Sequence, residues 1–171
     1  MSSFLLLVFL TSCESKLGKF EEDILFTKAT NDSVQKSLQN LDTVQVLKLR
    51  GKSRNMLLNF NMELGNDTLD IATARKIDGF IQAYRATVFF TAEIRQLRKA
   101  QEEQRERLQR LQSDIENNAG DRSLYFDHVQ FERREAEQLR RHDLLLEKQF
   151  IDFKQSYEQF KPTFERFKAV H

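Results

Sequence analysis

The chain has 171 residues, of which 31% are charged, and its 27 basic and 26 acidic side chains leave a formal net charge of +1 at pH 7. This balance provides no overall field to attract nucleic acid or an anionic membrane, so nucleic-acid binding is not expected. Five glycines, one proline and no tryptophan predict long helices with few turns, and a single cysteine excludes an intrachain disulfide.

The N-terminal segment predicts an export signal. Seven apolar residues run from Phe4 to Leu10, far fewer than the roughly 20 that a membrane-spanning helix needs. This length fits the apolar core of a removable secretory signal. The alternative is a buried N-terminal strand or helix in which Cys13 is a free core cysteine.

The tetrapeptide at the end of this run is more specific. Leu10-Thr11-Ser12-Cys13 resembles the lipobox of bacterial lipoproteins. The resemblance implies that residues 1–12 are a signal peptide cut off by signal peptidase II, and that the thiol of Cys13 carries a lipid that anchors the protein in the cell envelope. Glu14, in the sorting position, favours the outer membrane, with the protein facing the periplasm or the cell surface. The body is similar to small helical lipoproteins of Gram-negative envelopes.

Residues 13–32 are predicted to form a lipidated tether with one short amphipathic helix. Four apolar residues recur there at helical spacing among charged residues: Leu17, Phe20, Ile24 and Leu25. Asn31-Asp32-Ser33 then supplies residues that favour a helix N-cap. A long element is therefore expected to begin there, and residues 33–171 are assigned to a helical bundle with a projecting hairpin.

The segment 43–64 admits two interpretations. Its apolar residues partly alternate with polar ones, which is typical of a strand, and Gly51 would allow a β-hairpin. We favour a helix that Gly51 kinks or breaks, because two strands alone are marginally stable and the chain offers no third. Four basic residues around Gly51 are interpreted as a solvated turn, with anionic lipid or cell-wall polymer as the alternative contact: Lys48, Arg50, Lys52 and Arg54.

Two long helices and one turn account for the rest of the chain. The helices are predicted at about 68–116 and 122–170. The turn, 117–121, combines Gly120, which favours the left-handed conformation that ends a helix, with Asp121 as a cap for the next helix. The second helix ends in a heptad seam, for which we favour core packing over the binding of an apolar client or a membrane: Leu146, Phe150, Phe153, Tyr157, Phe160, Phe164 and Phe167.

Folding these two helices about the turn predicts an antiparallel register. Residues equidistant from about position 119 should meet, which places Ile94 beside the region 144–146 and Phe80 beside the region 153–157. The segment 33–64 would join that end, while the other end would project as a lone arm of two helices. We therefore predict an all-α fold, a helical bundle with a long antiparallel coiled-coil hairpin.

No catalytic, cofactor or metal site is predicted. His128 and Glu132 share a helix face and His142 follows, but a zinc site needs about three converging protein ligands. We find no serine or cysteine with a plausible base and no glycine-rich phosphate loop. Acid-first pairs four residues apart are expected to stabilise the two long helices: Glu103 with Arg107, Glu106 with Arg110, and Glu137 with Arg141.

These observations predict a non-catalytic envelope lipoprotein that acts as a coiled-coil interaction, adaptor or spacer module. Its expected partners are the membrane, through the lipid on Cys13, and an unidentified protein, and a homo-oligomer is left open. The bundle would lie near the membrane and the hairpin tip away from it, so Asn117, Asn118 and Asp121 are the candidate partner contacts. The alternative is a periplasmic holdase that encloses unfolded clients, a class that usually carries a strongly basic surface and a trimer-forming β-structured base.

Overall fold

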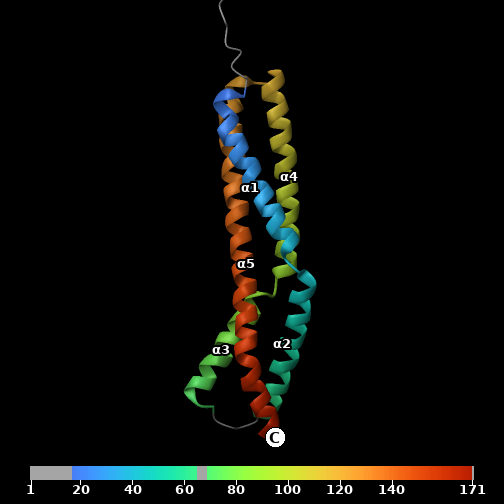
Figure 1. Cartoon of the computed structure of the whole chain (residues 1–171), viewed down its shortest axis with the longest axis vertical. Coiled ribbons are helices and arrows are strands. Elements are labelled where there is room, and N and C mark those ends of the chain that lie inside the picture. The colour runs from blue at the N-terminus through green and yellow to red at the C-terminus, as the bar shows by residue number, and fades with distance from the viewer. Residues whose placement is uncertain (1–16, 65–68, 171) are drawn as a thin grey trace, which may run out of the picture.

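The structure is an elongated rod of helices (Figure 1). The computed structural model describes residues 17–64 and 69–170, and the side chains of 17–60 and 69–166. No strand occurs in these described ranges, which confirms the predicted all-α helical bundle. In chain order the elements are η1 (Gly18–Phe20), α1 (Glu21–Asn40), α2 (Thr43–Leu64), α3 (Ile71–Ala86), α4 (Phe90–Asn117), η2 (Arg122–Leu124) and α5 (Tyr125–Val170).

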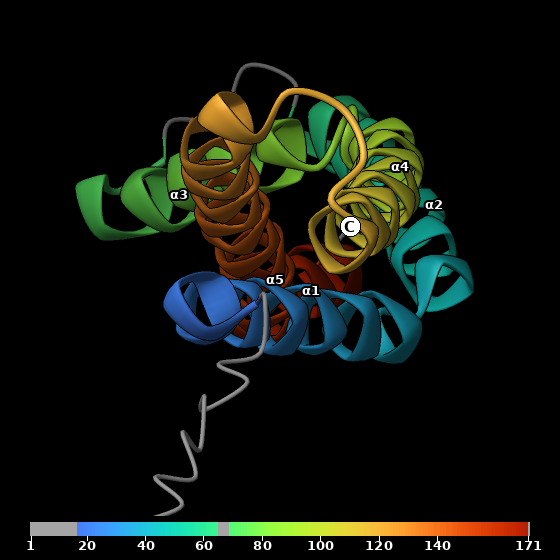
Figure 2. The ribbon, with the colours of Figure 1, turned by 90° about the horizontal axis from the view of Figure 1, so that it is seen from above.

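The last helix is the spine of the rod. α5 has 46 residues, which at 1.5 Å per residue correspond to about 70 Å. α1 and α4 pack on its first half, and α2 and α3 pack on its second half (Figure 1). In the view from above, α1 and α3 lie on different sides of α5 (Figure 2). Because α5 is shared, the two three-helix halves form one continuous body.

Three apolar clusters follow one another along this spine. The tip cluster, next to the 117–121 turn, contains Phe20, Ile24, Leu108, Leu111, Ile115, Tyr125 and Val129. The middle cluster contains Val34, Leu38, Leu41, Val46, Phe90, Ile94, Leu97 and Leu146. The far cluster contains Met56, Phe60, Ile77, Phe80, Phe153, Tyr157, Phe160 and Phe164.

The predicted register of the hairpin is confirmed. Ile94 and Leu146 share the middle cluster, and the rings of Phe80 and Tyr157 lie 6.5 Å apart between their centroids. The aromatic seam of α5 is core, as we expected, because Phe153 and Phe160 are almost wholly buried. The side chain of Phe167 lies outside the described residues.

The single helix predicted for 68–116 is wrong, because α3 ends at Ala86 and α4 begins at Phe90. A residue of α2 stabilises the break between α3 and α4. The Arg50 guanidinium donates hydrogen bonds to the carbonyl oxygens of Thr87 and Val88, at 2.7 and 2.9 Å. These contacts satisfy carbonyl groups that a continuous helix would have paired internally. Sequence periodicity carries no sign of such a distant donor.

The short helix predicted within the tether at 13–32 is present, but the separate helix start predicted at 31–33 is wrong. α1 runs without interruption from Glu21 to Asn40, and Asn31 is buried inside the bundle. The chain turns later, where the carboxylate of Asp42 accepts a hydrogen bond from the amide of Gln45 at 2.9 Å and caps α2. Because α1 packs along α4 and α5, the hairpin is not a lone two-helix arm.

Helix is the correct interpretation of 43–64, and the β-hairpin is wrong, because α2 spans Thr43–Leu64. The break expected at Gly51 is wrong as well, since the helix continues through it. A Cβ atom at Gly51 would meet nothing within 4 Å. The solvated turn assigned to the surrounding basic residues is therefore a stretch of helix.

Replacing Gly51 with alanine is expected to raise the free energy of unfolding by about 1 kcal/mol, because glycine in a helix interior costs about that much relative to alanine. Urea unfolding followed by circular dichroism measures the change. Gly120→Ala is the matched control: Gly120 has a φ of +78°, which strains an L side chain, so this variant should be less stable than the parent. Equal effects of the two changes would contradict the helical assignment of Gly51.

Candidate functional site

The three residues predicted as partner contacts lie together in the turn at the tip. Asn118 ends α4 in the left-handed conformation, with a φ of 52°, and the Asn117 side chain donates a hydrogen bond to the carbonyl oxygen of Ser113 at 2.8 Å. The Asp121 carboxylate accepts hydrogen bonds from the hydroxyl and amide of Ser123, at 2.6 and 2.9 Å, and these bonds lower the pKa of Asp121. The turn is therefore well capped, and contact of these residues with a partner stays a prediction.

The residues that lead into α1, and its first turn, pack against the same end of the rod. The ring of Phe20 meets the ring of Tyr125 edge to face, with centroids 6.4 Å apart, and Leu17 packs against the tip cluster. One turn further along, Asp23 binds Arg133 and Gln130 of α5. The hydrogen bond that Arg133 donates to the Asp23 carboxylate raises the pKa of Arg133.

This position of α1 corrects the expected orientation of the molecule. Cys13 lies outside the described residues, but it precedes Leu17 by four positions, and four residues span at most about 14 Å. A lipid on Cys13 would therefore lie near the tip cluster. The prediction that the hairpin tip lies far from the N-terminal segment is wrong, because the chain enters the bundle beside that tip.

A layer of amides crosses the bundle between the tip and middle clusters. The Gln101 side chain donates a hydrogen bond to the Asn31 side-chain oxygen at 2.5 Å, and the Asn31 amide donates to the Gln104 side-chain oxygen at 2.8 Å. Gln104 in turn donates to the backbone carbonyl of Glu132 at 2.7 Å. The layer thus joins α1, α4 and α5, and it explains why two glutamines occupy seam positions of α4. The sequence spacing gives no sign of the partner of either glutamine.

The residue that ends this layer on α5, Glu132, also has a buried carboxylate. Glu132 is nearly inaccessible, and its carboxylate accepts hydrogen bonds from Arg107 at 2.8 and 3.3 Å. The hydrogen bond that Arg107 donates to Glu132 also raises the pKa of Arg107. The expected pairing of Arg107 with Glu103 is replaced, since Glu103 lies 3.7 Å from Lys99.

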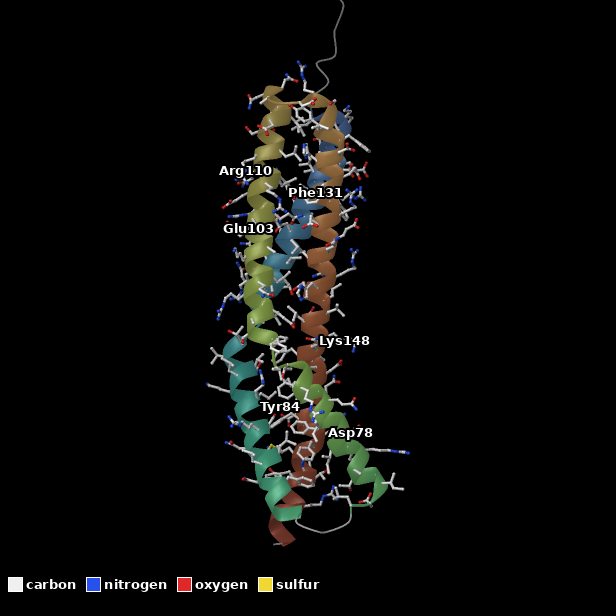
Figure 3. All side chains as sticks on the ribbon, turned by 180° about the vertical axis from the view of Figure 1, so that it is seen from behind. Asp78, Tyr84, Glu103, Arg110, Phe131 and Lys148 are labelled. Carbon is white, nitrogen blue, oxygen red and sulfur yellow. The ribbon has the colours of Figure 1, made fainter. Side chains whose placement is uncertain are left out.

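Charged side chains cover the outside of the rod, as Glu103, Arg110 and Lys148 show in Figure 3. Two of the expected pairs form: Arg110 lies 3.7 Å from Glu106, and Arg141 lies 3.9 Å from Glu137. Such exposed pairs contribute little stability each. They add charge to a surface on which α5 also exposes apolar side chains, among them Phe126 and Leu145.

The histidines of α5 do not converge with other ligands. His128 is exposed and His142 is half-buried, while Glu132, the expected neighbour of His128, binds Arg107. Within residues 17–64 and 69–170, no group of three or more histidine, cysteine, aspartate or glutamate side chains is placed to hold a metal ion.

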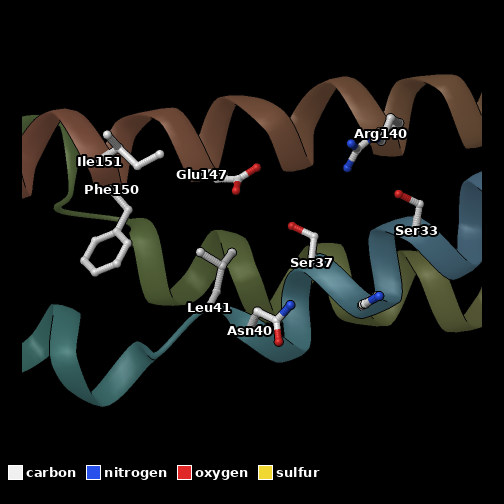
Figure 4. A pocket seen from close by; sticks show the side chains of 9 residues that line it. Ser33, Ser37, Asn40, Leu41, Arg140, Glu147, Phe150 and Ile151 are labelled. Atoms are coloured by element: carbon white, nitrogen blue, oxygen red, sulfur yellow. The ribbon is translucent and has the colours of Figure 1, made fainter.

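A groove of about 390 Å³ separates the end of α1 from α5 (Figure 4). Hydroxyl and amide groups of α1 face charged and apolar groups of α5 across it: Ser33, Lys36, Ser37, Asn40 and Leu41 on one side, Arg140, Glu147, Phe150 and Ile151 on the other. Arg140 is held by the buried carboxylate of Asp143 at 2.7 Å. The groove is shallow and of mixed polarity, so it offers contact surface more than a closed binding site.

None of the described helices is both long and apolar enough to cross a membrane. No protein family model, curated protein or solved structure matches this chain.

Proposed function

We propose that this protein is a non-catalytic lipoprotein of the bacterial envelope, anchored through a lipid on Cys13, whose helical rod acts as an interaction or spacer module. The observation that supports this role most directly is the packing of Leu17 and Phe20 on the tip cluster. It fixes the chain a few residues after Cys13 to one end of a stiff body. An anchor there gives the rod a defined near end and far end.

The orientation that follows puts the hairpin tip near the membrane. The α2–α3 half, which holds the far cluster, then lies away from it, at a distance set by the roughly 70 Å length of α5. The three clusters and the amide layer between them keep helices packed along the spine. A rod of this kind can present a surface at a fixed height above a membrane.

The holdase alternative is the second candidate, and we favour it less. That class usually has a strongly basic surface and a β-structured base, whereas this chain has a formal net charge of +1 and its one candidate β-hairpin segment, 43–64, is the helix α2.

Replacing Cys13 with alanine is expected to abolish incorporation of labelled palmitate and to move the protein from the membrane fraction to the soluble fraction. The physical reason is that the thiol is the attachment point of the acyl chains, and stable anchoring takes more than one such chain. Metabolic labelling followed by fractionation measures both effects. Ser12→Ala, which keeps a small residue before the cysteine, is the control that should stay lipidated. Labelling that persists in the Cys13→Ala variant would contradict the proposal.

Orientation can be tested in the same system. A fluorophore on a cysteine at exposed Ser123 should be quenched by nitroxide-labelled lipid headgroups, whereas one at exposed Lys154 should not. Equal quenching at both positions would mean that the rod lies flat on the membrane.

A further inference from the structure

The helix α2 has two apolar faces, of which only one is used inside the rod. Its inner face contributes Val46, Met56 and Phe60 to the middle and far clusters. The opposite face exposes aliphatic side chains: Val44, Leu47 and Leu58 are 58%, 55% and 52% accessible. At 100° per residue these three positions and Gly51 fall within about 60° of the helix circumference. We call this set the outer α2 stripe.

Gly51 lies in the middle of the outer α2 stripe, and neither backbone conformation nor packing within the rod requires a glycine at this position. Its Cβ position is open and its helix is continuous, so alanine would stabilise α2 more. A residue without a side chain at this position leaves a flat site at which another backbone can approach closely. A partner helix could therefore cross here at a short interaxial distance.

Basic residues border the outer α2 stripe on both sides. Lys48 and Lys52 lie along one edge and Arg54 along the other, and the sequence from Thr43 to Met62 contains no acidic residue. None of the ion pairs among the described residues includes these three cations. The fourth basic residue, Arg50, is already used at the break between α3 and α4.

We propose that the outer α2 stripe binds an acidic amphipathic helix of a partner protein. Apolar residues of that helix would cover Leu47 and Leu58, its backbone would cross at Gly51, and its carboxylates would pair with the bordering cations. A second copy of this chain fits less well, because an antiparallel pair of α2 helices centred on Gly51 would place Lys48 against Arg54. This inference names the class of partner that the proposed interaction module binds, and it therefore rests on that proposed function. It does not depend on the lipid at Cys13.

The test uses the full chain in neutral phosphatidylcholine nanodiscs and a synthetic three-heptad helix with leucine at its a and d positions and glutamate at e and g. Fluorescence anisotropy of the labelled peptide measures Kd, and the same peptide with lysine in place of glutamate is the probe control. The acidic peptide is expected to bind and the basic one at least 10-fold more weakly. Leu47→Asn should weaken binding of the acidic peptide several-fold, and Leu145→Asn, at a position of similar exposure on α5, should not change it.

Gly51→Leu distinguishes a crossing helix from a lipid surface. The variant adds exposed apolar area and improves helix propensity, so it should remain folded by circular dichroism, yet it should weaken binding of the acidic peptide at least 10-fold by holding the peptide away. Sedimentation of the Cys13→Ala full chain with phosphatidylglycerol vesicles is the second arm. Vesicle binding that tightens in Gly51→Leu would assign the stripe to a lipid surface and overturn the proposal. Absence of peptide binding, or unchanged binding by Gly51→Leu, would also overturn it, whatever the palmitate labelling shows.

Discussion

Replacing Phe160 with alanine is expected to lower the free energy of unfolding by about 3–5 kcal/mol, as is typical when a buried aromatic ring is removed from a core. The ring is 1% exposed, stacks on Phe80 with centroids 4.5 Å apart, and meets the edge of Phe60 at 5.9 Å. These three residues come from α5, α3 and α2. The lost ring would therefore leave a cavity at the point where all the helices of the far half meet.

Urea unfolding followed by circular dichroism measures this loss, with Phe126→Ala as the control on the same helix. Phe126 is 59% exposed, so its removal should change the free energy of unfolding by no more than about 0.5 kcal/mol. A small effect of Phe160→Ala, comparable to that of Phe126→Ala, would mean that α2 and α3 do not pack on α5 as described. Because α5 is shared by both halves, the transition of the Phe160→Ala variant also reports whether the halves unfold together.

The register of α5 against α3 could be predicted because it depends on local apolar spacing and on one turn. The heptad seam of α5 fixes which side of that helix is apolar, and the turn at 117–121 fixes the chain reversal. Together they place Phe80 beside Tyr157, as the structure confirms. Apolar spacing and the turn set this register, whereas the end of α3 at Ala86 did not follow from them.

The remaining parts depend on contacts between distant residues. Asn31 has the chemistry of a helix cap, and only its partners on α4 determine that it lies inside a continuous helix instead. Thr87 lies in a segment whose sequence pattern predicts a continuous helix. In the structure, Arg50 of α2 donates a hydrogen bond to its carbonyl oxygen, and the helix is interrupted there. We expected the tip to lie far from the N-terminal segment. The apolar spacing of residues 17–30 predicts a helix but does not indicate that Phe20 packs on Tyr125.

Replacing Asn31 with alanine is expected to destabilise the protein by about 2–4 kcal/mol. The change would leave the side-chain amide of Gln101 and the side-chain oxygen of Gln104 without their partner in a buried layer, and each unsatisfied buried group costs about 1–3 kcal/mol. Chemical denaturation measures the loss. Asp32→Ala, one residue further along and exposed, should have little effect, and an equal loss in both variants would contradict the buried layer.

A triple variant that changes Asn31, Gln101 and Gln104 to leucine separates stability from specificity. Replacing all the partners of a buried polar network with apolar groups removes the unsatisfied groups, so the triple variant should recover most or all of the stability that Asn31→Ala loses. The amide layer also favours a single axial position of α1, because a shift of α1 by one turn would separate Asn31 from Gln104. Hydrogen exchange of the α1 amides should therefore be faster in the triple variant than in the parent at equal global stability. Slower or equal exchange would remove the reason to regard this layer as what fixes α1 in one register on α4 and α5.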